Sequence, residues 1–297
     1  FMRLFFLVLI FIGLATGVSA EPIKVASLST VLSDIARNVG GDRVEVSEII
    51  KPGSDPHLYE PTPGDIKKIS SVQIVLASGL GFEPYLDKLR SSVEKSGVAF
   101  VVAGSAVKPI ACAEEDHHDH SHSHGASDPH WWHSIANVES VTLQLRDAFI
   151  AVDPDGRAQF EANAKAFEAK LKVLAKWTRL QLAVLPKSKR ILVTSHDALG
   201  YFARDYGFQV LPVQGISTSD QPSSQKVRNL IQEIKALGVK AIFAENIENP
   251  KVLQQITIET GANLGGTLYA DGLGVGEAGT YIGMMRSNVT TIVGALQ

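Results

Sequence analysis

Short β-branched runs alternate with helical stretches along most of this chain, and that alternation restricts its fold more than any other feature. The strand-like runs are expected at residues 23–26, 44–50, 72–77 and 98–102, and again at 190–194, 209–213, 241–244 and 263–268. The helical stretches between them are expected at residues 31–39, 64–69, 84–94, 199–206, 225–237 and 250–260. This order predicts βαβ units, and therefore an α/β fold with mainly parallel sheets in two similar lobes.

A long helix is predicted between the two lobes. Asp153 is a typical N-cap, Pro154 suits the first helical position, and Pro186 stops the helix. An apolar stripe with one polar member follows steps of three and four: Phe160, Ala164, Phe167, Leu171, Leu174, Thr178, Leu182 and Leu185. About thirty helical residues would span about 45 Å. A lone coiled-coil helix is the alternative, but the flanking βαβ lobes favour a stiff spine that limits hinge motion.

The first twenty residues have the pattern of a secretory signal peptide. Arg3 precedes an apolar run over residues 4–12, and small residues lead up to Ala20. A membrane anchor would need about 20 apolar residues, and polar residues from Thr16 onward interrupt this stretch. No cysteine lies at the junction, which excludes lipid attachment there. We therefore expect cleavage near Ala20 and export to the periplasm.

The expected organisation follows from these segments. It comprises a signal peptide (1–20), an N-terminal α/β lobe (21–152), the linking helix (153–186) and a C-terminal α/β lobe (187–297). A length of 297 residues fits one large or two modest domains, at about 100–200 residues each.

Charge and cysteine content exclude several classes of function. Lys plus Arg is 28 and Asp plus Glu is 31, a net charge of −3, which argues against nucleic acid as the partner. The single cysteine, Cys112, excludes an intramolecular disulfide, a Cys-based zinc finger and an iron–sulfur cluster. It is either a soft metal ligand or an unreactive thiol. Nine histidines remain as candidate metal ligands.

Four residues of ligand type follow the carboxyl ends of predicted strands: His57, His130, His196 and Asp271. Ligands bind at this edge of parallel α/β sheets. Taken singly, each histidine is more often a hydrogen-bonding loop residue, and Asp271 before Gly272 is more often part of a turn. Taken together, two lobes facing each other across a cleft could bring all four to one cation.

Five phrases of this sequence resemble a known family. They are DPHLYEPTP (55–63), DPHWW (128–132), SHDALGYFA (195–203), GIS (215–217) and YADGLG (269–274). They are similar to the periplasmic metal-binding proteins that serve zinc and manganese ABC importers. The resemblance implies two α/β lobes, a spine helix and an ABC permease in the inner membrane as partner. It also implies four metal ligands: His57, His130, His196 and Asp271.

One phrase departs from the family pattern. After Trp132 the chain continues His-Ser, where Leu and an acidic or Ser-Pro pair are commoner. The second ligand is therefore His130 or His133. The Asp-Pro-His frame favours His130, and His133 is then expected at the cleft wall or the surface.

Three imidazoles and one carboxylate suit Zn²⁺, whereas Mn²⁺ prefers more oxygen ligands. Manganese-selective members of the family commonly carry a carboxylate where His196 stands, so the resemblance favours the zinc-specific branch. Copper and nickel also bind imidazole. The expectation is a monomeric, high-affinity zinc receptor that serves the permease, with a periplasmic zinc chaperone as a second candidate partner.

The alternative of a different class is a secreted zinc-dependent hydrolase, with three histidine ligands and Asp271 as base. The sequence lacks His-Glu-x-x-His and a serine nucleophile on a glycine elbow. A fourth protein ligand would also leave no position for an activated water.

A second group of histidines lies in the low-complexity segment 114–125, which predicts a surface loop. These side chains are a candidate secondary metal site: His117, His118, His120, His122 and His124. A tolerated surface insertion is the alternative. Ordering a loop costs entropy, so binding there is expected to be weaker than at a preformed cleft.

Overall fold

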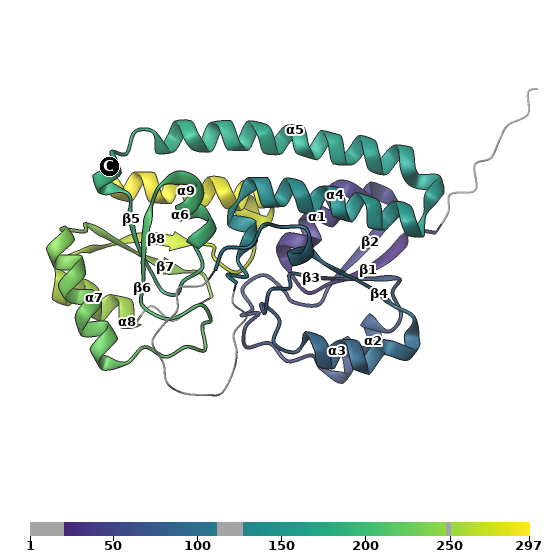
Figure 1. Cartoon of the computed structure of the whole chain (residues 1–297), viewed down its shortest axis with the longest axis horizontal. Helices are drawn as coiled ribbons and strands as arrows, with labels where there is room; N and C mark the ends of the chain where they lie inside the picture. The colour runs from purple at the N-terminus through teal and green to yellow at the C-terminus, as the bar shows by residue number, and fades with distance from the viewer. Residues whose placement is uncertain (1–20, 112–126, 248–250) are drawn as a thin grey trace, which may run out of the picture.

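The computed structural model describes residues 21–111, 127–247 and 251–297. Residues 1–20, Cys112 and the histidine-rich segment 114–125 therefore lie outside the described residues, and their assignments remain predictions. The described residues form two lobes, each built on a four-stranded parallel sheet (Figure 1). The strand orders are β2-β1-β3-β4 and β6-β5-β7-β8, so both lobes share one topology.

The predicted strands and helices are all present, with ends that shift by a few residues. The first lobe contains β1 (Ile23–Ser27), α1 (Thr30–Gly40), β2 (Val44–Glu48), α2 (Pro63–Ile69), β3 (Ile74–Ala77), α3 (Leu86–Val93) and β4 (Ala99–Val102). The second contains β5 (Ile191–Thr194), α6 (Gly200–Tyr206), β6 (Gln209–Pro212), α7 (Ser224–Leu237), β7 (Ala241–Glu245), α8 (Lys251–Thr260) and β8 (Asn263–Leu268).

The central strands β1, β3, β5 and β7 are buried on both faces, which is why they read as mostly apolar runs. In β1, Val25 packs into the core on the α1 side, whereas Ala26 packs with residues of α2 and α3. In β5, Leu192 and Val193 divide in the same way between two cores. Successive residues along these strands therefore pack against helices on opposite faces of the sheet.

Helix ends follow local chemistry. Thr62 and Asp65 form a capping box at the start of α2, with Pro63 at the first position. Helix α7 ends at Gly238, whose φ of 61° lies in the left-handed region and lets its N–H bond to the Ile234 carbonyl.

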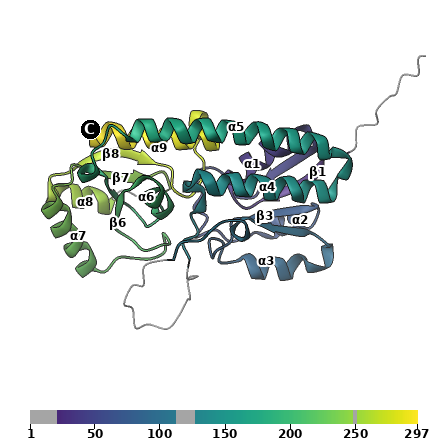
Figure 2. The same cartoon turned by 45° about the horizontal axis from the view of Figure 1, so that its top comes forward.

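The predicted spine is helix α5 (Arg157–Leu182), which passes along both lobes (Figures 1 and 2). The predicted apolar stripe is buried along its whole length, including Leu185 beyond the helix end. The helix starts later than predicted, because Pro154–Gly156 forms a 3₁₀ turn whose Gly156 N–H donates to the Asp153 side chain. Its 26 residues span about 39 Å.

Two helices that are not among those predicted from the sequence lie beside the spine. They are α4 (Ile135–Val152) and α9 (Tyr281–Leu296), and both pack against α5. The buried positions of α9 recur at steps of three and four from Tyr281 to Leu296, so the helical signal is present in the sequence. Within residues 21–111, 127–247 and 251–297, no helix combines the length and apolar content needed to cross a bilayer.

Candidate metal centre

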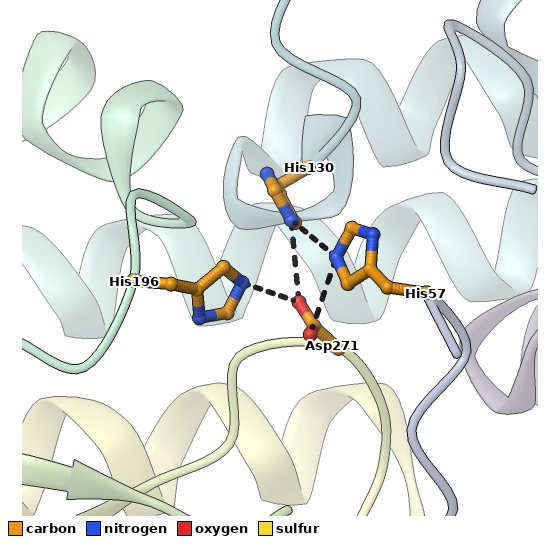
Figure 3. A group of neighbouring side chains, drawn as sticks. All are labelled: His57, His130, His196 and Asp271. Atoms are coloured by element: carbon orange, nitrogen blue, oxygen red, sulfur yellow. Dashed lines mark hydrogen bonds and ion pairs between the residues drawn. The ribbon is translucent and has the colours of Figure 1, made fainter. Parts of the chain in front are cut away.

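The fold brings together the four residues that the strand-end argument singles out. One ligand-type atom from each of His57, His130, His196 and Asp271 lies within 4.8 Å of those of the other three (Figure 3). All four side chains are buried. They come from four separate loops: the β2–α2 loop, the segment before α4, the end of β5 and the segment after β8. The two sheets therefore present their carboxyl edges to one shared site, as the parallel topology requires.

Four of the separations within the cluster are close to the edge length of a small coordination tetrahedron. Asp271 Oδ1 lies 3.1 Å from His196 Nε2 and 3.3 Å from His130 Nε2. His57 Nε2 lies 3.5 Å from Asp271 Oδ2 and 3.4 Å from His130 Nε2. A tetrahedral zinc ion with bonds of about 2.0–2.1 Å has ligand–ligand edges of about 3.3 Å. Figure 3 shows the three rings turned toward the carboxylate, each through its Nε2 edge.

Two further buried carboxylates orient two of the rings. Asp128 Oδ1 accepts from the His130 main-chain N–H at 2.8 Å and lies 2.8 Å from its Nδ1. Glu245 accepts from the His196 N–H at 3.1 Å through Oε1, and its Oε2 contacts His196 Nδ1. A carboxylate at Nδ1 holds the proton there and leaves the Nε2 lone pair for a metal.

Neither carboxylate is among the functional residues predicted from the sequence. Asp128 opens the Asp-Pro-His phrase that supports His130. Glu245 is the last residue of β7, so it lies at the sheet edge that carries the clustered side chains. Its position at a strand end was the available signal.

Aromatic rings close one side of the site. Phe82 packs against the His57 and His130 rings, with centroids 4.9 and 5.7 Å away. Trp132 packs against Phe82 at 4.8 Å and against His130 at 5.5 Å. These rings keep water from the side of His130.

His133 is buried, which excludes the surface as its position. Its Nε2 lies 2.8 Å from the Ala270 carbonyl, which also accepts from Trp132 Nε1 at 2.8 Å. The residue after that carbonyl is Asp271. His133 therefore holds the main chain beside a ligand-type carboxylate and does not itself join the cluster.

The pKa shifts of the clustered groups show which charges the site stabilises. Burial opposes charge on His130, but its hydrogen bonds to Asp128 and Asp271 outweigh burial and raise its pKa to about 9. Burial likewise opposes charge on His196, yet the charges of Asp271 and Glu245 raise its pKa well above the usual value. Burial would raise the pKa of Asp271, but the His196 and His57 rings hold that pKa well below its ordinary range.

His133 behaves differently, since burial and the neighbouring His130 lower its pKa to about 4 and leave it neutral. Without a metal, protons on His130 and His196 balance the Asp271 charge. Asp271 Oδ2 is buried and has no hydrogen-bond partner in the described part of the chain. A divalent cation would satisfy that oxygen and replace the protons, so the donor set fits a metal.

Comparison with known proteins gives a consistent pattern. Residues 25–295 match the family described as ZnuA, zinc-uptake complex component A, periplasmic. The chain is 35% identical over 277 residues to the iron-binding protein YfeA of Yersinia pestis, covering 92% of this chain and 86% of that protein. It is 33% identical over 293 residues to the manganese-binding lipoprotein MntA of Bacillus subtilis, covering 95% and 93%.

Solved structures agree on the fold. The periplasmic zinc-binding protein TroA of Treponema pallidum superposes with a TM-score of 0.84 at 27% identity, covering 93% of this chain and 99% of that one. A Mn-bound periplasmic metal-binding protein of Candidatus Liberibacter asiaticus superposes with a TM-score of 0.82 at 28% identity, covering 93% and 100%. The metals named in these relatives differ, so similarity alone does not identify the cargo.

Proposed function

Because this chain belongs to the ZnuA family of periplasmic metal-binding proteins of ABC importers, we propose that its cargo is Zn²⁺, which it binds in the periplasm and delivers to the import permease. The observation that carries the proposal is the cluster of three imidazoles and one carboxylate, whose ligand-type atoms all lie within 4.8 Å of one another, with several contacts of 3.1–3.5 Å among them. These separations suit a tetrahedral ion with bonds of about 2.0–2.1 Å. His57, His130, His196 and Asp271 are the proposed ligands.

The choice of zinc over manganese or iron depends on the donors. Mn²⁺ favours more oxygen donors and a larger coordination number than this set offers. The second candidate is Mn²⁺ or Fe²⁺, as named in MntA and YfeA. It has one point in its favour, because both oxygens of Asp271 face imidazoles and could supply a fifth donor.

The hydrolase alternative is not supported. The relatives are metal-binding proteins of transport systems, so the chain is a binding protein and not an enzyme. A cation enclosed by four protein ligands would also have no position for the water that a zinc hydrolase activates.

Several finer points remain part of the proposal. Residues 1–20 would act as a cleaved signal peptide, and the five histidines between residues 117 and 124 would form a weaker secondary site. The receptor would act as a monomer, with a zinc chaperone as a further partner.

Metal analysis of protein purified from periplasm tests the proposal, combined with zinc-edge absorption spectroscopy and competition titrations with Zn²⁺, Mn²⁺ and Fe²⁺. We expect one tightly held zinc with four N/O neighbours at about 2.0–2.1 Å. Asp271→Asn should abolish tight binding, whereas Asp87→Asn, in α3, should not. Manganese or iron in the tight site would overturn the zinc assignment, and protein without tightly bound metal would overturn the receptor.

A further inference from the structure

The four clustered side chains are not held equally. Buried carboxylates brace the rings of His130 and His196 at Nδ1. His57 has no such brace, because no hydrogen bond reaches its Nδ1 from the part of the chain that the structure describes. Its ring packs on Phe82 instead. His57 is therefore the ligand side chain whose position depends most on its main chain.

His57 is also the member of the cluster that faces the large cleft. A cleft of about 1020 Å³ opens between the lobes and is lined by His57, by Leu80 and Arg90 of the first lobe, and by Ile216 and Asp220 of the second. The other three members of the cluster do not line this cleft. A cation that leaves through it must pass His57.

The main chain of His57 is tied to the opposite lobe by one side chain. Asp55 Oδ1 accepts from the His57 N–H at 2.9 Å, and Asp55 Oδ2 accepts from Thr218 Oγ1 at 2.8 Å. Asp55 and Thr218 are 163 positions apart in the sequence. The two bonds connect the N-terminal ligand loop to the C-terminal lobe beside the cleft.

Thr218 is itself held in a defined place. Its turn is closed by the Asp220 N–H, which donates to the Ser217 carbonyl at 3.0 Å. The Ser217 N–H donates back to Asp220 Oδ2, also at 3.0 Å. Thr218 is buried, so its bond to Asp55 is shielded from competing water. The turn therefore presents the hydroxyl as a fixed donor.

We propose that Thr218 is a positioning residue that sets the rate of metal release, and that His57 is the ligand that leaves first. This inference rests on the proposed function. When the Thr218–Asp55 bond opens, the His57 loop loses its cross-lobe anchor and the His57 Nε2–metal bond breaks. A water molecule from the cleft takes the vacated position. The cation then stays on His130, His196 and Asp271 until it departs through the cleft.

The test measures zinc release from full-length protein by stopped-flow mixing with excess chromogenic chelator. Thr218→Val keeps the shape of the side chain but removes the hydroxyl, and should speed release about five- to tenfold, the effect of one lost hydrogen bond. Thr218→Ser keeps the hydroxyl and should restore slow release. Thr290→Val, on the exposed face of α9, is the matched control and should release zinc at the wild-type rate.

A double-variant experiment asks whether the effect passes through His57. In a His57→Ala background, adding Thr218→Val should leave the release rate unchanged, because the ligand that it positions is absent. Thermal unfolding of each metal-free variant shows that all are folded. Zinc release from Thr218→Val at the wild-type rate would overturn the proposal. So would an acceleration by Thr218→Val that is equally large with and without His57. Failure of the wild-type protein to bind zinc would instead overturn the proposed function.

Discussion

Individual side chains around the site depend on partners that are not ligands. Glu245 holds both the main-chain N–H and the ring of His196, and Asp128 holds His130 in the same way. Each carboxylate fixes a ring direction and makes its Nε2 a better donor. Affinity at this site should therefore respond to residues that never touch the metal.

Replacing Glu245 tests this directly. Glu245→Gln removes the charge behind His196, and zinc affinity should fall about 10–100-fold. Competition titration against a fluorescent zinc chelator measures the change. Glu233→Gln, on the exposed side of α7, is the control. An unchanged affinity in Glu245→Gln would show that His196 is not oriented through its Nδ1.

The affinity should also depend on pH over an unusually high range. Because the pKa of His130 in the metal-free protein is raised to about 9, a proton occupies that ring at neutral pH and must leave when metal binds. Zinc affinity should therefore keep rising from pH 5 to about 9, whereas unperturbed imidazoles would level off above about 7.5. Calorimetry in buffers of different ionisation enthalpy counts the released protons. Equal affinity at pH 5 and pH 7.5 would contradict histidine ligation.

The stability of the metal-free protein should change in the opposite direction. The His130 proton is held more tightly in the folded state than in the unfolded state, so its contribution is complete below about pH 6.5 and is lost as pH rises toward about 9. Urea unfolding of metal-free protein should give a lower midpoint at pH 9 than at pH 6.5. In zinc-loaded protein this loss should be absent, because the metal replaces the proton.

At the level of elements, the parallel strands determine where the clustered side chains lie. Each strand of a parallel sheet ends at the same edge, so the loops after β5 and β8 reach one region although they are far apart in sequence. The loop after β2 belongs to the other sheet and reaches that region because the two lobes pack together. Helix α5 then fixes the spacing of the two sheets by packing against α1 and α4 of one lobe and α9 of the other.

The spine can be weakened without touching the site. Phe167→Ala would leave a cavity on the buried face of α5 and should lower the free energy of unfolding by about 3–5 kcal/mol. Val173→Ala, at a position 62% exposed on the same helix, should change it by less than about 0.5 kcal/mol. Urea denaturation of the metal-free variants provides the comparison. Similar midpoints for the two would mean that α5 does not anchor the lobes.

For the whole molecule, the question is whether the cleft site works independently of the histidine-rich segment. The described side chains supply all four clustered groups without it. Deleting residues 116–124 should therefore lower the number of zinc ions bound while leaving the tightest one in place. Calorimetric titration of both proteins gives the stoichiometry. Loss of the tight site on deletion would remove the cleft residues as the principal ligands.

Much of this organisation can be predicted from the sequence because it has local causes. A period of two or 3.6 residues identifies strands and helices, Gly238 ends α7, and the strand ends point to His57, His196 and Asp271. The apolar stripe of α5 can also be predicted, because burial of one helix face places apolar residues at steps of three and four in the sequence. The same periodic pattern of buried residues is present in α9, although that helix is not among those predicted.

The tertiary structure decides what depends on contacts between distant segments. No local pattern pairs Thr218 with Asp55, places Glu245 behind His196, or turns His133 toward Ala270 instead of the cluster. A single hydrogen bond between remote loops leaves no periodicity, because it constrains one residue on each side. The sequence therefore determines which side chains are available at each strand end, and packing of the two lobes determines which of them face one another.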